Sequence, residues 1–237
     1  MRFTAQALTL FCVLFSPVVA WGQTIAGNVE VHFINVGQGD AILTMSPNRE
    51  CVMLIDSGDT RYPSSSKTFK AYMRDKVPLG SRIDLVVASH PHADHIGSML
   101  WVLQNYKVGT YIDNGINYKR AIYQKLKAEV QRQINTTGLN YFAHDQSTPP
   151  DQDFCRATNL NTTLLVPHGG YQKQFCDKNP NNCSTVVKMS YDGVSFLFPG
   201  DAEDEQESML LEDHEAPHDL PTIPYKHLSS SRSVHWP

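Results

Sequence analysis

The chain has 237 residues, of which 41% are hydrophobic and 19% are charged, and its formal net charge at pH 7 is −4. This length allows one large domain or two small ones, and the composition is that of an ordinary globular protein. The mildly acidic balance excludes a strong general attraction to nucleic acid, so binding of that kind would need a local basic patch.

Residues 1–20, MRFTAQALTLFCVLFSPVVA, differ from the rest of the chain. Arg2 is their only charge, an apolar run begins at Ala7, and Ala20 ends the segment with a small residue suited to signal-peptidase cleavage. Because the apolar run is too short for a comfortable membrane span, it predicts an export signal, with an uncleaved membrane anchor as the alternative. We therefore expect a secreted or periplasmic protein with no membrane span after cleavage.

Four cysteines remain once the predicted signal, which contains Cys12, is removed: Cys51, Cys155, Cys176 and Cys183. An exported protein meets an oxidising environment that favours disulfides, and four cysteines permit three connectivities. Cys176 and Cys183 close a short polar loop and are the pair that we expect. Their spacing does not match a CxxC zinc motif, so a structural metal is not expected there.

The first part of the chain predicts short strands in a β-meander, then a helix and a buried strand. Apolar residues alternate or run continuously between turn residues in these strands, and the last strand leads directly into a cluster of histidines. The continuous apolar run of that last strand is typical of a strand covered on both faces. The expected strands are 29–37, 41–45 and 51–58, the helix is 67–76, and the buried strand is 83–90.

Helices and strands continue to alternate after the histidine cluster. The helix expected over 118–134 carries apolar residues at four-residue steps, namely Ile122, Leu126, Val130 and Ile134. Its lysines and arginines lie largely off that stripe and form either a solvated face or a phosphate-binding patch. The other expected elements are helices at 96–106 and 203–212 and strands at 108–113, 162–167, 184–191 and 194–201.

Strands and helices are thus interleaved in both halves of the chain, with the chemically active residues at strand ends. This order predicts a layered α/β fold around one core, which we expect to span residues 21–220. Residues 221–237 contain prolines and serines without any periodicity, so they predict an irregular C-terminal tail.

The segment HPHADH packs four metal-type ligands into six residues: His90, His92, Asp94 and His95. Neutral imidazole and carboxylate are the ligands that borderline divalent metals prefer, Zn²⁺ foremost. A loop that follows a strand can direct alternate residues into one cavity, so His90 and His92 are expected to share one ion, with Asp94 and His95 at a neighbouring position. Two ions about 3.5–4 Å apart support hydrolysis by holding the attacking and leaving oxygens.

Four segments together resemble the metallo-β-lactamase fold: HFINVGQGDAIL, VMLIDSG, VVASHPHADHIG and NNCSTVVKMSYDGVSFLFPGD. Within that superfamily the chain is most similar to the ComEC-like (competence-protein) branch of hydrolases, over residues 29–203. The resemblance implies an α/β fold, a four-layer αββα sandwich of the metallo-β-lactamase type with a dinuclear metal site along one edge of its sheets.

The resemblance also implies roles for single residues. Asp56 of LIDSG would support and orient the metal site, and Asp201 of FPGD would bridge both metals. Asp40 of the GQGD turn would lie near the mouth of the site, unless it is a simple turn residue. Together with Asp94, the residues Asp40 and Asp56 are the candidate catalytic carboxylates.

Two further histidines would complete the metal shells. His168 of VPHGG stands where the superfamily places the histidine that completes the first metal shell, although a loop histidine without function is the alternative. The last motif of this branch usually reads HHGS, whereas here Lys226-His227-Leu228-Ser229 stands in its place. A charged lysine is no metal ligand. His227 is the remaining candidate, and the C-terminal part is atypical or truncated relative to the family.

The resemblance predicts an exported metallo-hydrolase with two divalent metal ions, zinc being expected and manganese the alternative. Its favoured substrate is a phosphodiester, either DNA or a small phosphoester. The alternatives are hydrolysis of a β-lactam or lactone, and an inactive or weakened relative that keeps only a partial metal site. The number of subunits is not readable from the sequence.

Overall fold

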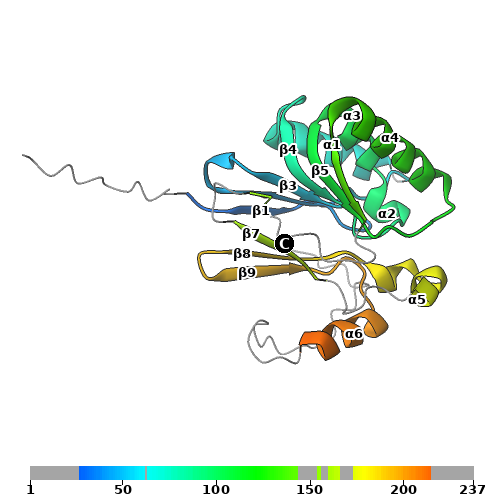
Figure 1. The fold of residues 1–237 in the computed structure, drawn as a ribbon. Coiled ribbons are helices and arrows are strands. Elements are labelled where there is room, and N and C mark those ends of the chain that lie inside the picture. Colours follow the sequence, from blue (N-terminus) through cyan, green and yellow to red (C-terminus); the bar gives the residue numbers. More distant parts are fainter. Residues whose placement is uncertain (1–26, 62, 144–153, 156–159, 166–172, 215–237) are drawn as a thin grey trace, which may run out of the picture.

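The computed structural model describes residues 27–61, 63–143, 154–155, 160–165 and 173–214 (Figure 1). The predicted signal (1–20), the predicted tail (221–237) and the candidate ligands His168 and His227 lie outside the described residues. In the described part of the chain, no helix combines the length and the apolar character that a bilayer crossing needs.

Six strands form one sheet in the order β1-β2-β3-β4-β5-β6. The first three pair antiparallel, which confirms the predicted meander, whereas β3 to β6 run parallel. The strands are β1 (Glu30–Phe33), β2 (Ile42–Met45), β3 (Val52–Ile55), β4 (Arg82–Val87), β5 (Lys107–Asp113) and β6 (Asn140–Ala143).

Helices cover the outer face of this sheet. The layer contains α1 (Pro63–Lys76), α3 (Met99–Asn105) and α4 (Ala121–Thr137), with the single-turn helix α2 (Ala93–Ile96) beside it (Figure 1). Leu126 and Val130 are buried as predicted, while Ile122 and Ile134 pack at the margins of the same core. Steps of four residues slightly exceed the helical turn of about 3.6 residues, so the apolar stripe drifts toward its ends.

The second sheet has three antiparallel strands in the order β7-β8-β9. Its strands are β7 (Asn161–Leu165), β8 (Val186–Tyr191) and β9 (Val194–Phe198). A two-residue turn joins β8 to β9 through Asp192 and Gly193, both with positive φ, as hairpins with right-handed strand twist require.

A second core fills the space between the sheets. Side chains alternate along β3, so Leu54 packs toward the helices while Met53 and Ile55 join the inner core with Val187 and Met189 of β8. Helix α6 (Asp204–His214) lies on the far side of the second sheet, and α5 (Lys173–Lys178) lies at its end (Figure 1). The predicted αββα layering is confirmed over the described residues.

Three features of the secondary structure differ from the prediction. The expected helix at 96–106 begins later, at Met99 of α3, and a separate single turn, α2, lies within the histidine motif, with Gly97 and Ser98 between the two helices. Strand β6 and helix α5 were not predicted. Both are short, and length is the main signal by which periodicity separates helices from strands.

Two disulfides connect the cysteines, Cys51 with Cys155 and Cys176 with Cys183. The second is the predicted pair. It closes a loop with a sequence separation of 7, whereas the first spans a separation of 104 and joins the loop before β3 to a segment that precedes β7.

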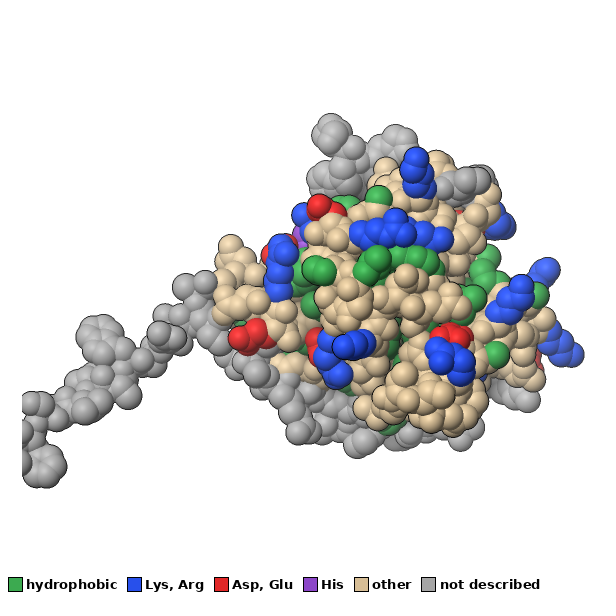
Figure 2. All heavy atoms as spheres, turned by 90° about the horizontal axis from the view of Figure 1, so that it is seen from above, with side chains coloured by type: hydrophobic (Ala, Val, Ile, Leu, Met, Phe, Trp, Pro, Cys, Tyr) green, Lys and Arg blue, Asp and Glu red, His purple; other side chains and the backbone are tan. Residues whose placement is uncertain are grey.

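Figure 2 looks down on the helix layer, where Lys and Arg side chains stand in separate places, some of them beside acidic side chains. Two cations of α4 are paired: Arg132 Nη2 lies 2.6 Å from Glu129 Oε1, and Lys127 Nζ lies 3.4 Å from Asp113 Oδ2. This pairing uses part of the positive charge of α4, which favours a solvated face over a phosphate-binding patch.

Candidate metal centre

The centre begins where two parallel strands end at the same edge of the first sheet. Asp56 follows β3, and Ser89 and His90 follow β4, which pairs with β3. Asp56 is buried and has a φ of 57°, a left-handed conformation that aspartate tolerates better than most residues. The backbone thus turns sharply after β3 and holds the Asp56 carboxylate beneath the histidine loop.

The Asp56 carboxylate accepts three hydrogen bonds from the loop after β4. Ser89 donates its backbone N–H at 2.8 Å and its hydroxyl at 2.6 Å, and His95 donates from Nδ1 at 2.8 Å. Because Nδ1 of His95 is used in this way, its Nε2 is left for another partner. Asp56 therefore contacts the histidine loop directly, and its role in orienting a metal ligand stays a prediction.

The neighbouring turns hold the same loop from the other side. The backbone carbonyl of His95 accepts from the Ser57 N–H at 2.7 Å and from the Ser57 hydroxyl at 3.1 Å. Gly39 lies so close that a Cβ there would be 1.8 Å from the Asp94 carbonyl oxygen. The Gly58 N–H donates to the Asp40 carbonyl at 2.8 Å, which ties the GQGD turn to the turn after β3.

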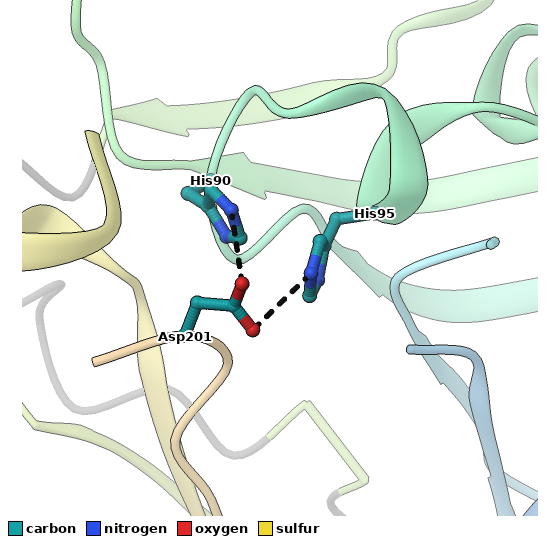
Figure 3. Close-up of side chains that lie close together, drawn as sticks. All are labelled: His90, His95 and Asp201. Carbon is teal, nitrogen blue, oxygen red and sulfur yellow. Dashed lines mark ion pairs between the residues drawn. The ribbon is translucent and has the colours of Figure 1, made fainter. Parts of the chain in front are cut away.

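Asp201 reaches the centre from the second sheet, in the turn after β9. Gly200, with a φ of 59°, brings this turn against Ser89, and a Cβ at Gly200 would lie 2.7 Å from the Ser89 Cβ. The Asp201 carboxylate then stands between two imidazoles: Oδ2 is 3.9 Å from His90 Nε2, and Oδ1 is 3.3 Å from His95 Nε2 (Figure 3).

The surroundings of His95 Nε2 show whether these residues suit a metal ion. His95 Nε2 is buried and has no hydrogen-bond partner, since its 3.3 Å approach to Asp201 is not aligned for one. Buried polar atoms almost always have a partner, so this nitrogen is available to a ligand. Ligand atoms of His90, His95 and Asp201 all lie within 4.8 Å of one another. Two imidazole nitrogens and a carboxylate fit a zinc-like divalent ion.

Asp40 belongs to a second group of possible ligands, with Asp56 and His95. The pKa of Asp40 is raised to about 6, mainly by burial; His95 opposes the rise, and the nearby carboxylates of Asp56, Asp201 and Asp94 contribute to it. Carboxylates gathered in this way make the edge of the sheet favourable for a cation. The Asp40 carboxylate thus lies beside the cluster rather than in an isolated turn.

The histidines of the cluster have different pKa shifts. Burial lowers the pKa of His90 well below its usual value, and the neighbouring His95 and His92 lower it further. Burial alone would also lower the pKa of His95, but the Asp56 and Asp201 carboxylates raise it well above its usual value. Burial is the main cause of the lowered pKa of His92. His90 and His92 are thus held as neutral imidazoles, the form that binds metals.

The remaining predicted ligands lie around this group. His92 Nδ1 is 3.0 Å from His90 Nε2, so the two histidines are adjacent, as sharing of one ion requires. Asp94 accepts a 3.1 Å hydrogen bond from Gln38 of the GQGD turn. Neither His92 nor Asp94 belongs to a ligand group found among the described residues, where His90 groups with His95 and Asp201 instead. Metal ligation by any of these residues stays a prediction.

Two features of the centre were not predicted from the sequence. Ser89 links Asp56 to both His90 and His95 through its hydroxyl, with oxygen–nitrogen distances of 3.1 Å and 3.4 Å. Its position directly before the histidine motif was the available signal. A pocket of about 360 Å³ also opens beside His92, between the loop before α4 and the C-terminal end of α5 with the residues that follow it.

The sequence model of the Metallo-beta-lactamase superfamily matches residues 35–133. Among characterised proteins, ComE operon protein 3 of Bacillus subtilis (strain 168) is 24% identical over 193 residues. The match covers 77% of this chain and 23% of that protein, so the chain spans less than a quarter of the relative's length.

Solved structures are similar to the chain at low sequence identity. A metallo-beta-lactamase with a HARLDQ motif from Cronobacter sakazakii is 14% identical, with a TM-score of 0.43 over 77% of this chain and 63% of that chain. Igni18, a metallo hydrolase from Ignicoccus hospitalis, is 19% identical, with a TM-score of 0.43 over 73% of this chain and 61% of that chain.

The family match includes the GQGD turn, Asp56 and the whole histidine loop, which are the parts that form the first half of the centre. The two sheets and their helix layers agree with the fold that this family implies. Residues 35–133 are therefore similar to the metallo-beta-lactamase superfamily, and the described residues around them form a layered α/β fold that agrees with this likeness.

Proposed function

We propose that this protein is an exported, divalent-metal-dependent hydrolase of phosphodiesters. The observation that carries the proposal is the grouping of His90, His95 and Asp201, whose ligand atoms all lie within 4.8 Å of one another. The buried Nε2 of His95 makes no hydrogen bond and lies 3.3 Å from the Asp201 carboxylate. A divalent ion between these groups would bind the nitrogen and the carboxylate together.

The residues around this centre would have separate roles in holding and orienting the ion. A bound divalent ion supplies Lewis acidity and a reactive water at neutral pH. Asp56 holds His95 in the tautomer that presents Nε2, and Ser89 fixes Asp56 against the loop. Asp201 adds negative charge from the opposite sheet, so the site closes only when both sheets are in place.

We assign two ions to the full site, zinc being favoured and manganese the alternative. His90, His92 and His168 would hold one ion, and Asp94, His95 and His227 the other, with Asp201 between them. Support comes from the adjacency of His90 and His92 and from the central place of Asp201. The Asp40 carboxylate, which lies against the cluster, would add negative charge at its edge.

The phosphodiester substrate, whether DNA or a small phosphoester, is supported by the sequence likeness to the competence branch. Similarity to ComE operon protein 3 over 77% of this chain agrees with it. Export is supported by the character of residues 1–20 and by two disulfides, which persist in oxidising compartments. β-Lactam or lactone hydrolysis is the competing outcome.

The test combines metal content with turnover of bis-p-nitrophenyl phosphate by the full chain. Zinc- or manganese-loaded wild type should bind two ions and hydrolyse the ester. His92→Ala and Asp201→Asn should lose bound metal and at least about a hundredfold in kcat/KM. His32→Ala is the matched control, because His32 contacts Glu30 and Tyr72 instead of the cluster.

Three results would decide between the alternatives. Loss of metal and turnover in the two cluster variants, but not in His32→Ala, supports the proposal. One ion or none with no turnover overturns it in favour of an inactive relative. Turnover of a β-lactam or a lactone without phosphodiester cleavage overturns the substrate class while leaving the metal centre in place.

A further inference from the structure

We propose that the pocket beside His92 binds the nucleoside unit of the substrate, with its base against Tyr118. This inference rests on the proposed phosphodiesterase function and names the substrate class as a nucleotide ester. The pocket has a volume of about 360 Å³ and is lined by His92, by the loop before α4, and by the C-terminal end of α5 with the residues that follow it. That volume is at the small end of the range for small-molecule sites, about 300–1,000 Å³.

Tyr118 provides the aromatic wall. It is half-buried, and its ring centroid lies 5.8 Å from that of His92, with an interplanar angle of 69°. Tyr123 supports it from behind at 6.2 Å, also edge-on. A base that stacks on Tyr118 would thus lie next to a candidate metal ligand, which suits an ester whose phosphate reaches the centre.

Hydrogen bonds from β5 and α4 fix the loop that carries Tyr118. Asp113, at the end of β5, accepts from the Gly115 N–H at 3.0 Å. Tyr123 Oη donates to the Ile116 carbonyl at 3.0 Å, and Gln124 Nε2 donates to the Tyr118 carbonyl at 2.6 Å. The ring position is therefore held before a ligand arrives, which reduces the ordering cost of binding.

The opposite wall is formed by the C-terminal end of α5 and the start of the segment between α5 and β8. The Cys176–Cys183 disulfide closes it, and Glu203 of the turn before α6 accepts hydrogen bonds from Asn179 at 2.7 Å and Asn181 at 2.8 Å. Asn114 Nδ2 donates to the Cys183 carbonyl at 2.9 Å, which joins this wall to the loop that carries Tyr118. The two walls thus have a fixed spacing.

The lining has the chemistry that a nucleotide requires. Tyr118 offers a flat π-face, and stacking of a base on an aromatic side chain is tolerant of base identity. Asn117 and Asp177 are exposed polar groups on either wall, suited to the polar edges of a base. Lys178 supplies a positive charge to the same pocket. A purely aliphatic ester would leave this aromatic wall unused.

The first test compares two chromogenic diesters on the metal-loaded full chain. These are the p-nitrophenyl ester of thymidine monophosphate and methyl p-nitrophenyl phosphate. Wild type should favour the thymidine ester in kcat/KM. Tyr118→Leu should raise KM for that ester about tenfold, by loss of stacking, and change kcat/KM for the methyl ester much less, so that the ratio of the two esters falls. Tyr118→Phe keeps the ring and should retain the preference.

Tyr72→Leu is the matched control, because Tyr72 is another partly buried tyrosine that packs against the helix-side core and bonds His32. It should lower the melting temperature as much as Tyr118→Leu without altering the ratio of the two esters. An equal preference of wild type for both esters, or a Tyr118→Leu variant with an unchanged ratio, overturns the inference while the proposed function stands.

The second test measures equilibrium binding and does not require turnover. Thymidine monophosphate should bind the full chain, and Tyr118→Leu should lower this affinity about tenfold. Lys178→Gln should also lower the affinity, whereas Lys125→Gln, a change at an exposed position of α4, should not. If neither ester is hydrolysed, the proposed function fails, and this binding pattern alone decides the inference. Absence of binding, or equal binding by Tyr118→Leu, overturns it.

Discussion

Nδ1 of His95 and Oδ2 of Asp56 lie 2.8 Å apart, and both side chains are almost completely buried. The two residues are 39 positions apart in the chain: Asp56 follows β3, and His95 lies in α2, after the neighbouring strand β4. The contact fixes which nitrogen of His95 faces Asp201. Partners of this kind set the tautomer and ring orientation of a metal-binding histidine.

Asp56→Asn should weaken divalent metal binding about 10–100-fold, because an amide cannot supply the charge that holds His95 in this orientation. Asparagine also tolerates the left-handed backbone of this position, so the effect is not one of backbone strain. Competition with a chromophoric chelator measures the affinity.

Asp113→Asn serves as the control for Asp56→Asn, since Asp113 is a buried carboxylate at the end of β5. It should lower stability with little effect on metal affinity. Equal losses of affinity in both variants would mean that burial of charge, and not the contact with His95, is responsible.

Gly39→Ala should destabilise the protein by about 3 kcal/mol or more and weaken metal binding. A Cβ at this position would collide with the Asp94 carbonyl, so the histidine loop must move. Urea unfolding and the chelator titration together measure both effects.

Gly193→Ala separates the collision from the backbone strain. Gly193 has a φ of 78°, close to the 74° of Gly39, but a Cβ there would meet no atom within 4 Å. It should cost about 1–2 kcal/mol, the strain of a left-handed alanine, without any change in metal affinity. If Gly39→Ala lowers stability and metal affinity no more than Gly193→Ala does, the contact with Asp94 is unimportant.

Replacing both Cys51 and Cys155 by serine should lower the free energy of unfolding by about 4–5 kcal/mol. The same change at Cys176 and Cys183 should cost about 2–3 kcal/mol, because the shorter loop loses less entropy when it is closed in the unfolded chain. All four cysteines are buried, so the two double variants are comparable in burial. Urea unfolding measures both values, and a larger loss of unfolding free energy in the Cys176/Cys183 variant than in the Cys51/Cys155 variant would contradict this order.

Gln206→Ala should destabilise the protein by about 2–3 kcal/mol. Gln206 is fully buried in α6 and bonds both backbone groups of Ser184, accepting from the N–H at 3.0 Å and donating to the carbonyl at 2.6 Å. Gln131→Ala, an exposed position on α4, should change stability by less than about 0.5 kcal/mol. Thermal unfolding of the two variants gives the comparison.

The first half of the fold could be read from the sequence because its signals are local. The apolar run of β4 and the stripe of Leu126 and Val130 follow directly from strand and helix periods. The separate turn α2 and the later start of α3 were not visible, since the apolar pattern continues across Gly97. A Cβ at Gly97 would lie 2.3 Å from the Gly58 carbonyl oxygen, a long-range contact that periodicity does not encode.

The candidate centre was predicted as residue types but not as geometry. HPHADH and Asp56 carry a recognisable pattern, whereas the hydrogen bond of Asp94 to Gln38 depends on how two turns pack. Ser89 and Tyr118 have ordinary residue types for a loop, and only their neighbours in space give them a role. Contacts of this kind need the tertiary structure because their partners are distant in sequence.

Asp201 comes from the second sheet, while His90 and His95 come from the first, and the Thr185 N–H donates to the Ser89 carbonyl at 2.8 Å where the two meet. During synthesis the histidine loop therefore emerges more than a hundred residues before its carboxylate partner. An ion bound by residues of both sheets would connect early and late parts of the chain. Its affinity would then report on sheet docking, and added metal would favour the docked state by mass action.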